Sequence, residues 1–531
     1  MPRNIEIVLL PEQVANELLI KEFASRDLEI SIKTITDVII RKRSIDARSK
    51  QVKYRLSVDV YINETPPLLN ISKENYMDCS NKQPVLIIGA GPAGLFAALR
   101  CLEDGFKPII IERGKEVRER RRDLAAINKL HTINPNSNYC FGEGGAGTYS
   151  DGKLYTRSTK RGDVNRILKI LVSHGAPSDI LVDAHPHIGT NKLPDVVIDI
   201  RKTILQYGGE IHFNTLLTGL IIKDSSIKGI MVRKVDLASS SNEFSIDGKS
   251  LILATGHSAF DAYELLQKAN VLIHSKPFAL GVRIEHPQQL IDSIQYHCTT
   301  RNPHLPPASY SLVHQAMNRG VYSFCMCPGG IIAPCATSPG EIVVNGWSPS
   351  KRNNPFANSG MVVSVDDNDF KPFQKNNALM GLFYRQQIEQ RAYKMAGSNL
   401  QAPAQRMMDF VERKLSNDLP KNSYIPGVLS TEMDDLLPSP IVNSLRESLK
   451  HFGTKMKGYL TNEAILVGVE SRTSSPVRIP RDKDTLQHPQ IKGFYPCGEG
   501  AGYAGGIISA AIDGENCAHM ATEYLKQLKH P

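Results

Sequence analysis

The sequence predicts an α/β protein with two further α+β parts, and three observations lead to this fold class. The chain has 531 residues, which is too long for one ordinary core. A buried-strand pattern, a glycine-rich turn and a helical pattern follow one another from Pro84 onward. The stretch 276–470 is richer in Pro, Asn and Ser and lacks this alternation. We therefore expect a small domain at 1–78, an α/β domain made of 79–275 and 471–531, and an inserted domain at 276–470.

Composition narrows the class of protein. Apolar residues make up 41% and charged residues 22%, as in folded globular chains. The net charge of +9 allows attraction to phosphates, acidic substrates or nucleic acid, but a spread surface excess explains it as well. The nine cysteines are odd in number and scattered, unlike a disulfide framework. Neither a signal peptide nor a membrane-length apolar run is present, so we expect a cytoplasmic protein without a membrane partner.

Residues 1–78 are expected to form a small basic α+β domain. Its predicted elements are a strand, a helix begun by proline and two more strands, at Ile5–Leu10, Pro11–Ser25, Ile35–Arg41 and Val52–Ile62. Seven basic residues against one acid lie at 41–55, around the turn expected between the last two strands. Such a hairpin could contact nucleic-acid phosphates, although a solvated edge that resists aggregation is favoured. The polar stretch 63–82 is the expected linker.

A glycine-rich turn joins the strand Val85–Ile88 to the helix Ala93–Glu103. Its first glycine allows a tight turn, its second lets the backbone approach a pyrophosphate, and its third lets helix and strand pack closely. The start of the helix offers unpaired N–H groups and a partial positive charge to the diphosphate. The pattern predicts a Rossmann-like dinucleotide-binding domain, whose cofactor contacts we assign to Gly89, Gly91, Pro92, Ala93 and Gly94.

An acid closes the next predicted strand, Pro108–Ile111. Glu112 stands 18 residues after Gly94, and its carboxylate can accept hydrogen bonds from both ribose hydroxyls. A 2′-phosphate at the same place would be repelled, so we expect the adenosine of FAD or NAD rather than of NADP. Arg113, the next residue, is expected beside the same cofactor.

Three further segments resemble those of FAD-binding proteins. Gly208–Leu217 resembles the segment whose backbone meets the adenine, with Leu217 at the contact. Leu251–Gly256 resembles the Ala-Thr-Gly strand end of two-dinucleotide-fold flavoenzymes, which implies contacts by Thr255 and Gly256. Together with the glycine-rich turn and the third segment, Gly493–Gly500, they make four segments in the order found in FAD-binding proteins, which favours FAD over NAD.

The last of these segments, Gly493–Gly500, resembles the strand whose Gly-acid pair binds the ribityl and phosphate region. Here that pair is Gly498 and Glu499, with Glu where the pattern usually has Asp. A helix predicted at 507–526 follows. Its N-terminus would stabilise the anionic reduced flavin. The expected contacts at its start are Gly505, Gly506 and Ile507.

Five longer strings resemble one branch of the glutathione-reductase-like flavoproteins, the uncharacterised bacterial and plastid FAD-dependent dehydrogenases. They lie at 141–154, 185–190, 278–287, 322–330 and 469–478. The resemblance covers essentially the whole chain. It implies FAD and a redox role but no substrate. Our leading hypothesis is hydride transfer between FAD and an unidentified small molecule. The first string resembles a loop that crosses the inner face of the flavin, which implies contacts by Gly145, Gly147 and Thr148; an ordinary tight loop is the alternative.

Three residues are candidates for catalysis, each with a plainer alternative. His187 could donate a proton near the flavin, or it could be hydrogen-bonded in a loop. Cys325 belongs to a Cys-x-Cys motif, for which buried thiols are favoured over redox or zinc chemistry. Arg472 would suit an anionic substrate, or it could hold two domains together. No set of ligands with zinc spacing is found, so no metal is expected.

The sequence contains no second glycine-rich fingerprint after a strand. NADH, NADPH or an electron-carrier protein would therefore meet the flavin only transiently, from the substrate side. We expect an FAD-dependent oxidoreductase. The alternative is a redox-responsive factor that binds RNA or protein through the basic N-terminal domain. The substrate, the electron partner and the oligomeric state are left open by the sequence.

Overall fold

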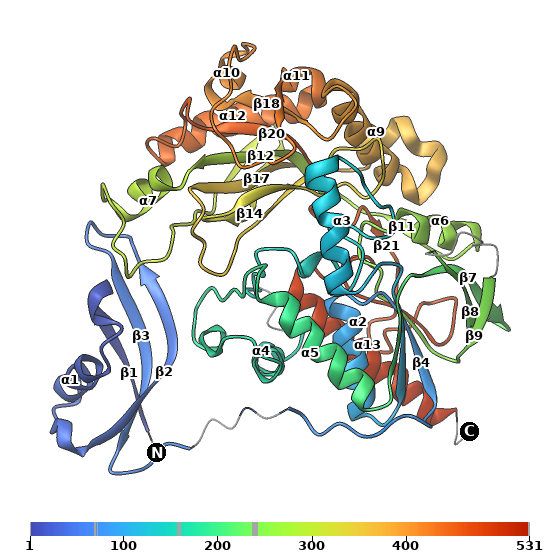
Figure 1. Cartoon of the computed structure of the whole chain (residues 1–531), viewed down its shortest axis with the longest axis horizontal. Coiled ribbons are helices and arrows are strands. Elements are labelled where there is room, and N and C mark those ends of the chain that lie inside the picture. Colours follow the sequence, from blue (N-terminus) through green and yellow to red (C-terminus); the bar gives the residue numbers. More distant parts are fainter. Residues whose placement is uncertain (1, 68–70, 72, 157–160, 236–242, 529–531) are drawn as a thin grey trace.

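The computed structural model describes residues 2–67, 71, 73–156, 161–235 and 243–528. Three parts are visible in Figure 1: a small N-terminal sheet to one side, a central α/β domain, and an inserted domain above it. The predicted fold class is confirmed. Residues 68–70 and 72 of the expected linker lie outside the described residues. No helix among the described residues is long and apolar enough to span a membrane.

The N-terminal domain is an antiparallel sheet with one helix packed on it. The strand order is β1-β3-β2, and the bounds are β1 Arg3–Leu9, β2 Ile35–Asp46 and β3 Lys53–Ile62. The prediction of one helix over Pro11–Ser25 was wrong in its bounds. A short 3-10 turn at Pro11–Gln13 comes first, and α1 covers Glu17–Asp27. Asn16 starts α1 because its side chain accepts hydrogen bonds from the N–H groups of Leu18 and Leu19.

The basic run at 41–55 differs from the expected solvated turn. Because β2 continues to Asp46, Arg41 and Arg43 lie within a strand. Arg43 ties this domain to the central one through ion pairs with Asp179 and Asp183, at 3.0 and 2.7 Å. The other arginines of the run also have carboxylate partners, in the pairs Arg41–Asp59, Arg48–Asp46 and Arg55–Asp46. The arginines are thus already paired within the protein, which leaves less positive charge for nucleic acid than the sequence suggested.

The central domain is built on a parallel sheet of five strands in the order β22-β10-β4-β5-β6. Its strands are β4 Pro84–Ile88, β5 Lys107–Ile111, β6 Glu210–His212, β10 Leu251–Leu253 and β22 Phe494–Pro496. Both faces are covered, as parallel sheets require. Val85 and Ile87 pack in the cluster that includes helices α2 and α13, whereas Leu86 and Ile88 pack toward the opposite face. The strand β22 comes from the end of the chain, so the inserted domain interrupts this sheet in sequence.

Helices and a second small sheet cover the two faces. The covering helices are α2 Pro92–Glu103, α3 Val117–Leu130, α4 Val164–Ser173, α5 Leu193–Gln206, α6 Phe260–Lys268 and α13 Ile507–Gln527. The small sheet is antiparallel, with β7 Thr215–Lys223, β8 Ser226–Lys234 and β9 Glu243–Asp247. Figure 1 shows α2, α5 and α13 lying close together beside β4.

The inserted domain contains a mixed sheet of seven strands, in the order β13-β14-β17-β12-β20-β18-β19. These strands are β12 Phe278–Pro287, β13 Val313–Ala316, β14 Arg319–Cys327, β17 Phe356–Val365, β18 Ala402–Arg406, β19 Val428–Ser430 and β20 Ile465–Glu470. A hairpin of β15 Ile331–Pro334 and β16 Val344–Trp347 lies against it. The main helices are α7 Gln288–Tyr296, α9 Met380–Met395 and α12 Ser439–Lys455. The pair β11 His274–Ser275 and β21 Val477–Arg478 joins the two points where the chain leaves and re-enters the central domain.

Candidate functional site

One pocket collects most of the residues that the sequence singled out. Its wall comes from the turn after β4, the end of β5, the loop 140–153, the ends of β10 and β22, the start of α13, and the inserted domain. We call the part around Gly89–Gly91 and Glu112 the adenosine end. We call the part around Asp151–Lys153, Phe324 and Cys325 the cap end. The predicted residues that line the pocket are Gly89, Gly91, Pro92, Ala93, Glu112, Arg113, Gly145, Gly147, Leu217, Thr255, Gly256, Gly498, Glu499, Gly505, Gly506, Ile507, Cys325 and Arg472.

The glycines of the adenosine end fall into two kinds. A side chain on Gly94 would place its Cβ 1.9 Å from the carbonyl oxygen of Gly89, so this glycine is required by the packing of α2 on the turn. At Gly91, by contrast, a Cβ would meet nothing nearer than 3.9 Å. At Gly505 and Gly506 it would meet nothing within 4 Å. These three glycines border open space in the pocket, which fits a cofactor that needs close approach to the backbone.

Two helices start at the pocket without a side-chain cap. Gly91 is the N-cap of α2 and Gly506 is the N-cap of α13, and neither start has a side-chain hydrogen bond to its first turn. By contrast, α1 and α4 are capped by Asn16 and Asp163. An uncapped helix start offers N–H groups and a partial positive charge to an anion. The start of α2 can therefore face a diphosphate. The start of α13, a helix of 21 residues, can face a reduced flavin ring.

Glu112 has a structural role that the sequence did not suggest. Its carboxylate is 5% exposed and accepts hydrogen bonds from the backbone N–H groups of Ala90, Gly114 and Gly142 at 2.8, 2.8 and 3.0 Å. It thus ties the glycine-rich turn to the loop that follows α3. Each carboxylate oxygen has more than one lone pair, so the predicted bonds to ribose hydroxyls stay compatible with this geometry.

The loop 138–147 is held by a buried arginine that sequence reasoning missed. Arg120, on α3, is fully buried and donates to the carbonyl oxygens of Asn138, Tyr139, Glu143 and Gly145 at 2.8–2.9 Å. Burial lowers its pKa. Four carbonyl acceptors replace the water that a guanidinium loses on burial. The contact is with backbone and not with side chains of a motif, so no sequence pattern identifies it.

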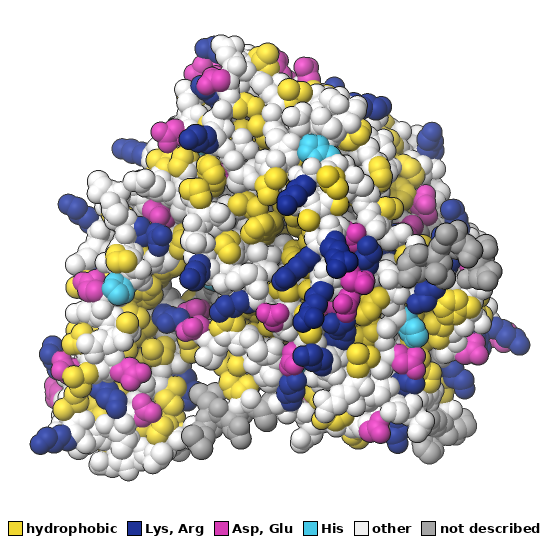
Figure 2. All heavy atoms as spheres, in the orientation of Figure 1, with side chains coloured by type: hydrophobic (Ala, Val, Ile, Leu, Met, Phe, Trp, Pro, Cys, Tyr) yellow, Lys and Arg dark blue, Asp and Glu magenta, His cyan; other side chains and the backbone are white. Residues whose placement is uncertain are grey.

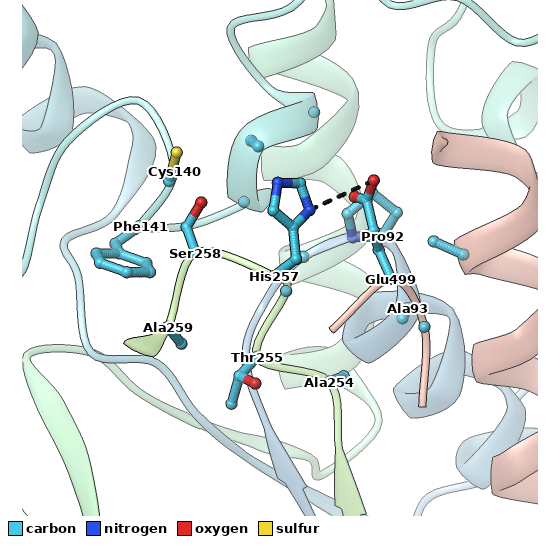
Figure 3. Close-up of a pocket in the computed structure, with 18 of the residues that line it drawn as sticks. Pro92, Ala93, Cys140, Phe141, Ala254, Thr255, His257, Ser258, Ala259 and Glu499 are labelled. Carbon is cyan, nitrogen blue, oxygen red and sulfur yellow. Dashed lines mark ion pairs between the residues drawn. The ribbon is translucent and has the colours of Figure 1, made fainter. Parts of the chain in front are cut away.

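A second residue that sequence reasoning missed, His257, faces Glu499, the acid expected to bind the ribityl chain. His257 follows Thr255 and Gly256 at the end of β10, and its Nδ1 lies 3.4 Å from a carboxylate oxygen of Glu499. Figure 3 shows the imidazole pointing toward Glu499 and Pro92 inside the pocket. The His-Glu pair joins the ends of β10 and β22, which are neighbours in the sheet. Its sequence signal was the position of a polar residue directly after the Ala-Thr-Gly strand end.

The cap end is built from side chains of three distant segments. Lys153 Nζ lies 3.7 Å from Asp151 and 3.8 Å from the sulfur of Cys325. Asp151 is 1% exposed and pairs with Arg352 at 2.7 Å. Burial raises the pKa of Asp151, but the charges of Lys153 and Arg352 outweigh burial and hold it at about 2. Phe324 and Asn345 of the inserted domain complete this wall.

Three predicted site residues lie elsewhere than expected. His187 does not line the pocket; its Nε2 lies 3.2 Å from the carbonyl oxygen of Ser350, the loop hydrogen bond that was its alternative. Thr148 turns away from the pocket and donates to the carbonyl oxygen of Glu143. Gly94 does not line the pocket, but it lies beneath the turn in the packing role that the sequence predicted for it.

Arg472 lines the pocket, but its guanidinium is already engaged. It donates to Glu389 at 2.9 and 3.2 Å, to Glu341 at 3.2 Å and to Thr337 at 2.7 Å. Arg385 lies 3.4 Å from Glu389 in the same buried cluster. The anion-binding role of Arg472 stays a prediction; its present partners show an arginine that organises the interior behind the cap end.

One group of possible metal ligands occurs among the described residues, Cys497, Asp513 and Cys517. A guanidinium already occupies that position. Arg481 donates to Asp513 at 2.5 and 3.0 Å and to the sulfur of Cys517 at 3.3 Å. The arginine supplies the positive charge that a metal ion would otherwise bring.

Comparisons with known proteins agree on the class of this site. Residues 84–121 match the model of an FAD binding domain, and residues 277–473 match that of an FAD-dependent protein, C-terminal domain-like. Residues 1–61 match a domain of unknown function. The fold and the pocket thus define a protein that binds FAD, and the predicted cofactor is confirmed.

Similar proteins place the chain more closely. An uncharacterized protein of Clostridium beijerinckii is 40% identical over 517 residues, which are 94% of each chain. A digeranylgeranylglycerophospholipid reductase of Methanosarcina acetivorans is 27% identical over 32% of this chain and 37% of its own. The open conformation of a flavocytochrome c3 fumarate reductase matches over 83% of this chain and 78% of its own, with 13% identity and a TM-score of 0.36. The chain belongs to the family of FAD-dependent proteins that includes the Clostridium protein, and its predicted class, an FAD-dependent oxidoreductase, is confirmed.

Proposed function

We propose that this flavoprotein is a dehydrogenase or reductase that transfers hydride between FAD and a small organic molecule admitted at the cap end. One observation carries the proposal. Phe324, Cys325 and Asn345 of the inserted domain line the same pocket as the glycines that fit the cofactor. A flavoenzyme places its substrate against the ring of the cofactor, and the inserted domain supplies that wall.

The residues of the chain would share this work as follows. The start of α2 and Gly91 would hold the diphosphate, and Glu499 the ribityl hydroxyls. The uncapped start of α13 at Gly506 would stabilise negative charge on the reduced ring. Bound FAD supplies the two-electron chemistry. Phe324 would exclude water from the cap end, and the half-buried His257 beside Glu499 could hold a proton.

The charge of the substrate is left to experiment, because Arg472 is engaged by Glu389 and Glu341. NADH, NADPH or a carrier protein would reach the flavin from the same side, since the sequence has no second fingerprint. Arg118, Arg121 and Arg122 of α3 are exposed, and Figure 2 shows basic side chains gathered near the middle of this face. An acidic carrier protein would meet that surface by charge complementarity. The nine cysteines are all free thiols, which supports a reducing compartment such as the cytoplasm.

The test is an anaerobic screen of the FAD-loaded chain. NADH, NADPH and hydroxy, amino and unsaturated acids are each mixed with the protein while flavin absorbance is followed. We expect one class of compound to bleach the flavin or, with the reduced protein, to restore its colour. Phe324→Trp should slow that reaction on the order of tenfold without changing FAD affinity, because it narrows only the cap end. If every compound fails in both directions, the proposal is wrong.

A further inference from the structure

Two cysteines of β14 stand at the cap end, one behind the other. The ladder between β14 and β17 is irregular from Phe324 to Cys327, and Cys325 has a φ of +46°. The bulge places Cys325 in the wall of the pocket, while Cys327 is fully buried. Bulges and strained residues of this kind often re-aim a side chain at a functional site. Here one thiol is open to the flavin pocket and the other is shielded.

Two cations face these sulfurs from different elements. Lys153 Nζ lies 3.8 Å from Cys325 Sγ and 3.8 Å from Cys327 Sγ. From β12, Arg283 donates to the carbonyl oxygen of Cys325 at 2.7 Å and lies 3.5 Å from the sulfur of Cys327. Arg283 is fully buried and keeps one carboxylate partner, Glu470 at 2.7 Å. Cations at this distance favour a thiolate over a thiol.

The two cysteines are also hydrogen-bonded to each other, since the Cys327 thiol donates to the carbonyl oxygen of Cys325 at 3.3 Å. A hydrogen bond from the Cys327 thiol lowers the pKa of Cys325, and it does so against burial and with the help of Lys153 and Arg283. The same bond, together with burial, raises the pKa of Cys327. The carboxylate of Asp151 raises the pKa of Cys325 but is the weakest of these influences and is itself paired with Arg352. These directions favour the thiolate on Cys325, on the pocket side, and keep the proton on Cys327, whose thiol is a hydrogen-bond donor.

We propose that Cys325 and Cys327 form a redox-active pair that exchanges two electrons with the FAD of this pocket. This proposal rests on the proposed function only in that FAD occupies the pocket. In the oxidative direction, the S–H bond of Cys327 breaks and an S–S bond forms between the two sulfurs. Two electrons and the proton of Cys327 pass to oxidised FAD, which becomes the reduced anion. Lys153 stays protonated and serves to hold the thiolate.

The spacing of the motif is compatible with such a bond. In a regular strand, residues i and i+2 face the same side with Cα atoms roughly 6–7 Å apart, near the upper limit for a disulfide. The bulge breaks this regular spacing, and both sulfurs lie 3.8 Å from the same atom, Lys153 Nζ. A short disulfide ring in a strand is strained and easily reduced, as a catalytic disulfide must be.

The first experiment measures thiol reactivity in the FAD-free wild-type chain. Iodoacetamide is added between pH 5 and pH 9, and each cysteine is followed by peptide mass spectrometry. At pH 7 we expect Cys325 to react on the order of tenfold faster than Cys140, which lines the same pocket and so has matched access. Lys153→Met should remove most of this advantage and move the pH midpoint of Cys325 upward. Equal rates for the two cysteines would overturn the proposal.

The second experiment tests disulfide formation. The FAD-free chain is equilibrated in glutathione buffers of graded potential, quenched with acid and alkylated. We expect Cys325 and Cys327 to lose their alkylation together, with the loss of two hydrogens from their peptide. In Cys327→Ser, Cys325 should instead carry glutathione. If wild-type Cys325 carries glutathione while Cys327 stays a thiol, the pair is not redox-active.

These outcomes are separate from those of the bleaching screen. The thiol measurements need neither flavin nor substrate, so their failure leaves hydride transfer intact. Conversely, a chain whose flavin no compound bleaches can still show a fast Cys325 and a Cys325–Cys327 disulfide.

Discussion

The adenosine end and the cap end of the pocket differ in the chemical groups that face it. At the adenosine end, glycines and helix starts present backbone to the cofactor, and Glu112 holds that backbone in place. At the cap end, charged side chains line the space for a substrate: the buried Asp151 and Arg472 and the partly exposed Lys153. Backbone can bind a diphosphate common to many flavoproteins, whereas side chains can be exchanged to suit a substrate. The comparison explains why the cofactor could be identified and the substrate could not.

The largest effect is expected from the charges behind the cap end. Glu389→Gln removes the carboxylate that Arg472 and Arg385 share, and leaves two buried guanidiniums with less negative charge. Breaking a buried ion pair from one side costs about 3–5 kcal/mol, so the free energy of unfolding in urea should fall by that amount. Glu463→Gln, at an exposed position of the same domain, is the matched control and should change it little. A loss below about 1 kcal/mol at position 389 would mean that the cluster is not a structural unit.

At the adenosine end, two Gly→Ala substitutions should separate FAD binding from folding. Gly91→Ala places a Cβ in open space, so the free chain should lose no more than about 1 kcal/mol of stability. That methyl group would displace a bound diphosphate from the N–H groups of α2. Losing one charge-assisted hydrogen bond of about 1.5–3 kcal/mol should weaken FAD binding roughly 10- to 100-fold. Isothermal titration of the FAD-free chain measures this change.

Gly94→Ala is the matched variant within the same turn. Its Cβ would lie 1.9 Å from the carbonyl oxygen of Gly89, so the fold itself should lose roughly 1–3 kcal/mol or more. Thermal unfolding of the FAD-free chain should therefore rank wild type and Gly91→Ala together, with Gly94→Ala below them. The reverse order would show that the glycines of this end do not divide into binding and packing positions.

The sequence predicted the residues that present backbone to the cofactor better than the side chains of the cap end. The turn at Gly89–Gly94, Glu112 and the pair Gly498–Glu499 were found because their spacing along the chain repeats a backbone geometry. Arg120 was missed because it contacts backbone carbonyl oxygens of a loop, and Arg283 because its partners Cys325 and Glu470 lie far away in sequence. Arg472 was assigned to a substrate because its residue type suits an anion, but its partners Glu341 and Glu389 appear only in the fold. Likewise, Pro11 suggested a helix start, while the cap at Asn16 sets the actual start of α1.

The stability of the inserted domain should also depend on pH, through Glu285 of β12. The carboxylate of Glu285 accepts a hydrogen bond from the backbone N–H of Ser423 at 2.7 Å. Burial raises the pKa of Glu285 to about 7, above its ordinary value of 4.5, although the Ser423 hydrogen bonds and the Arg283 charge oppose this. The folded chain therefore holds this proton more tightly than the unfolded chain. The resulting stability is fully present below about pH 4.5 and is lost as pH rises through 7.

Glu285→Gln keeps the uncharged shape and should remove this dependence. Relative to the variant, the wild-type chain should lose stability between pH 5 and pH 7, with a slope of at most about 1.4 kcal/mol per pH unit. Urea unfolding at half-unit pH intervals measures the difference. Since Gly91→Ala changes no titrating group, it should leave the slope of the wild type unchanged. A parallel pH profile for wild type and Glu285→Gln would assign the pH response to other buried acids whose pKa burial raises to about 7, such as Glu143 and Glu470.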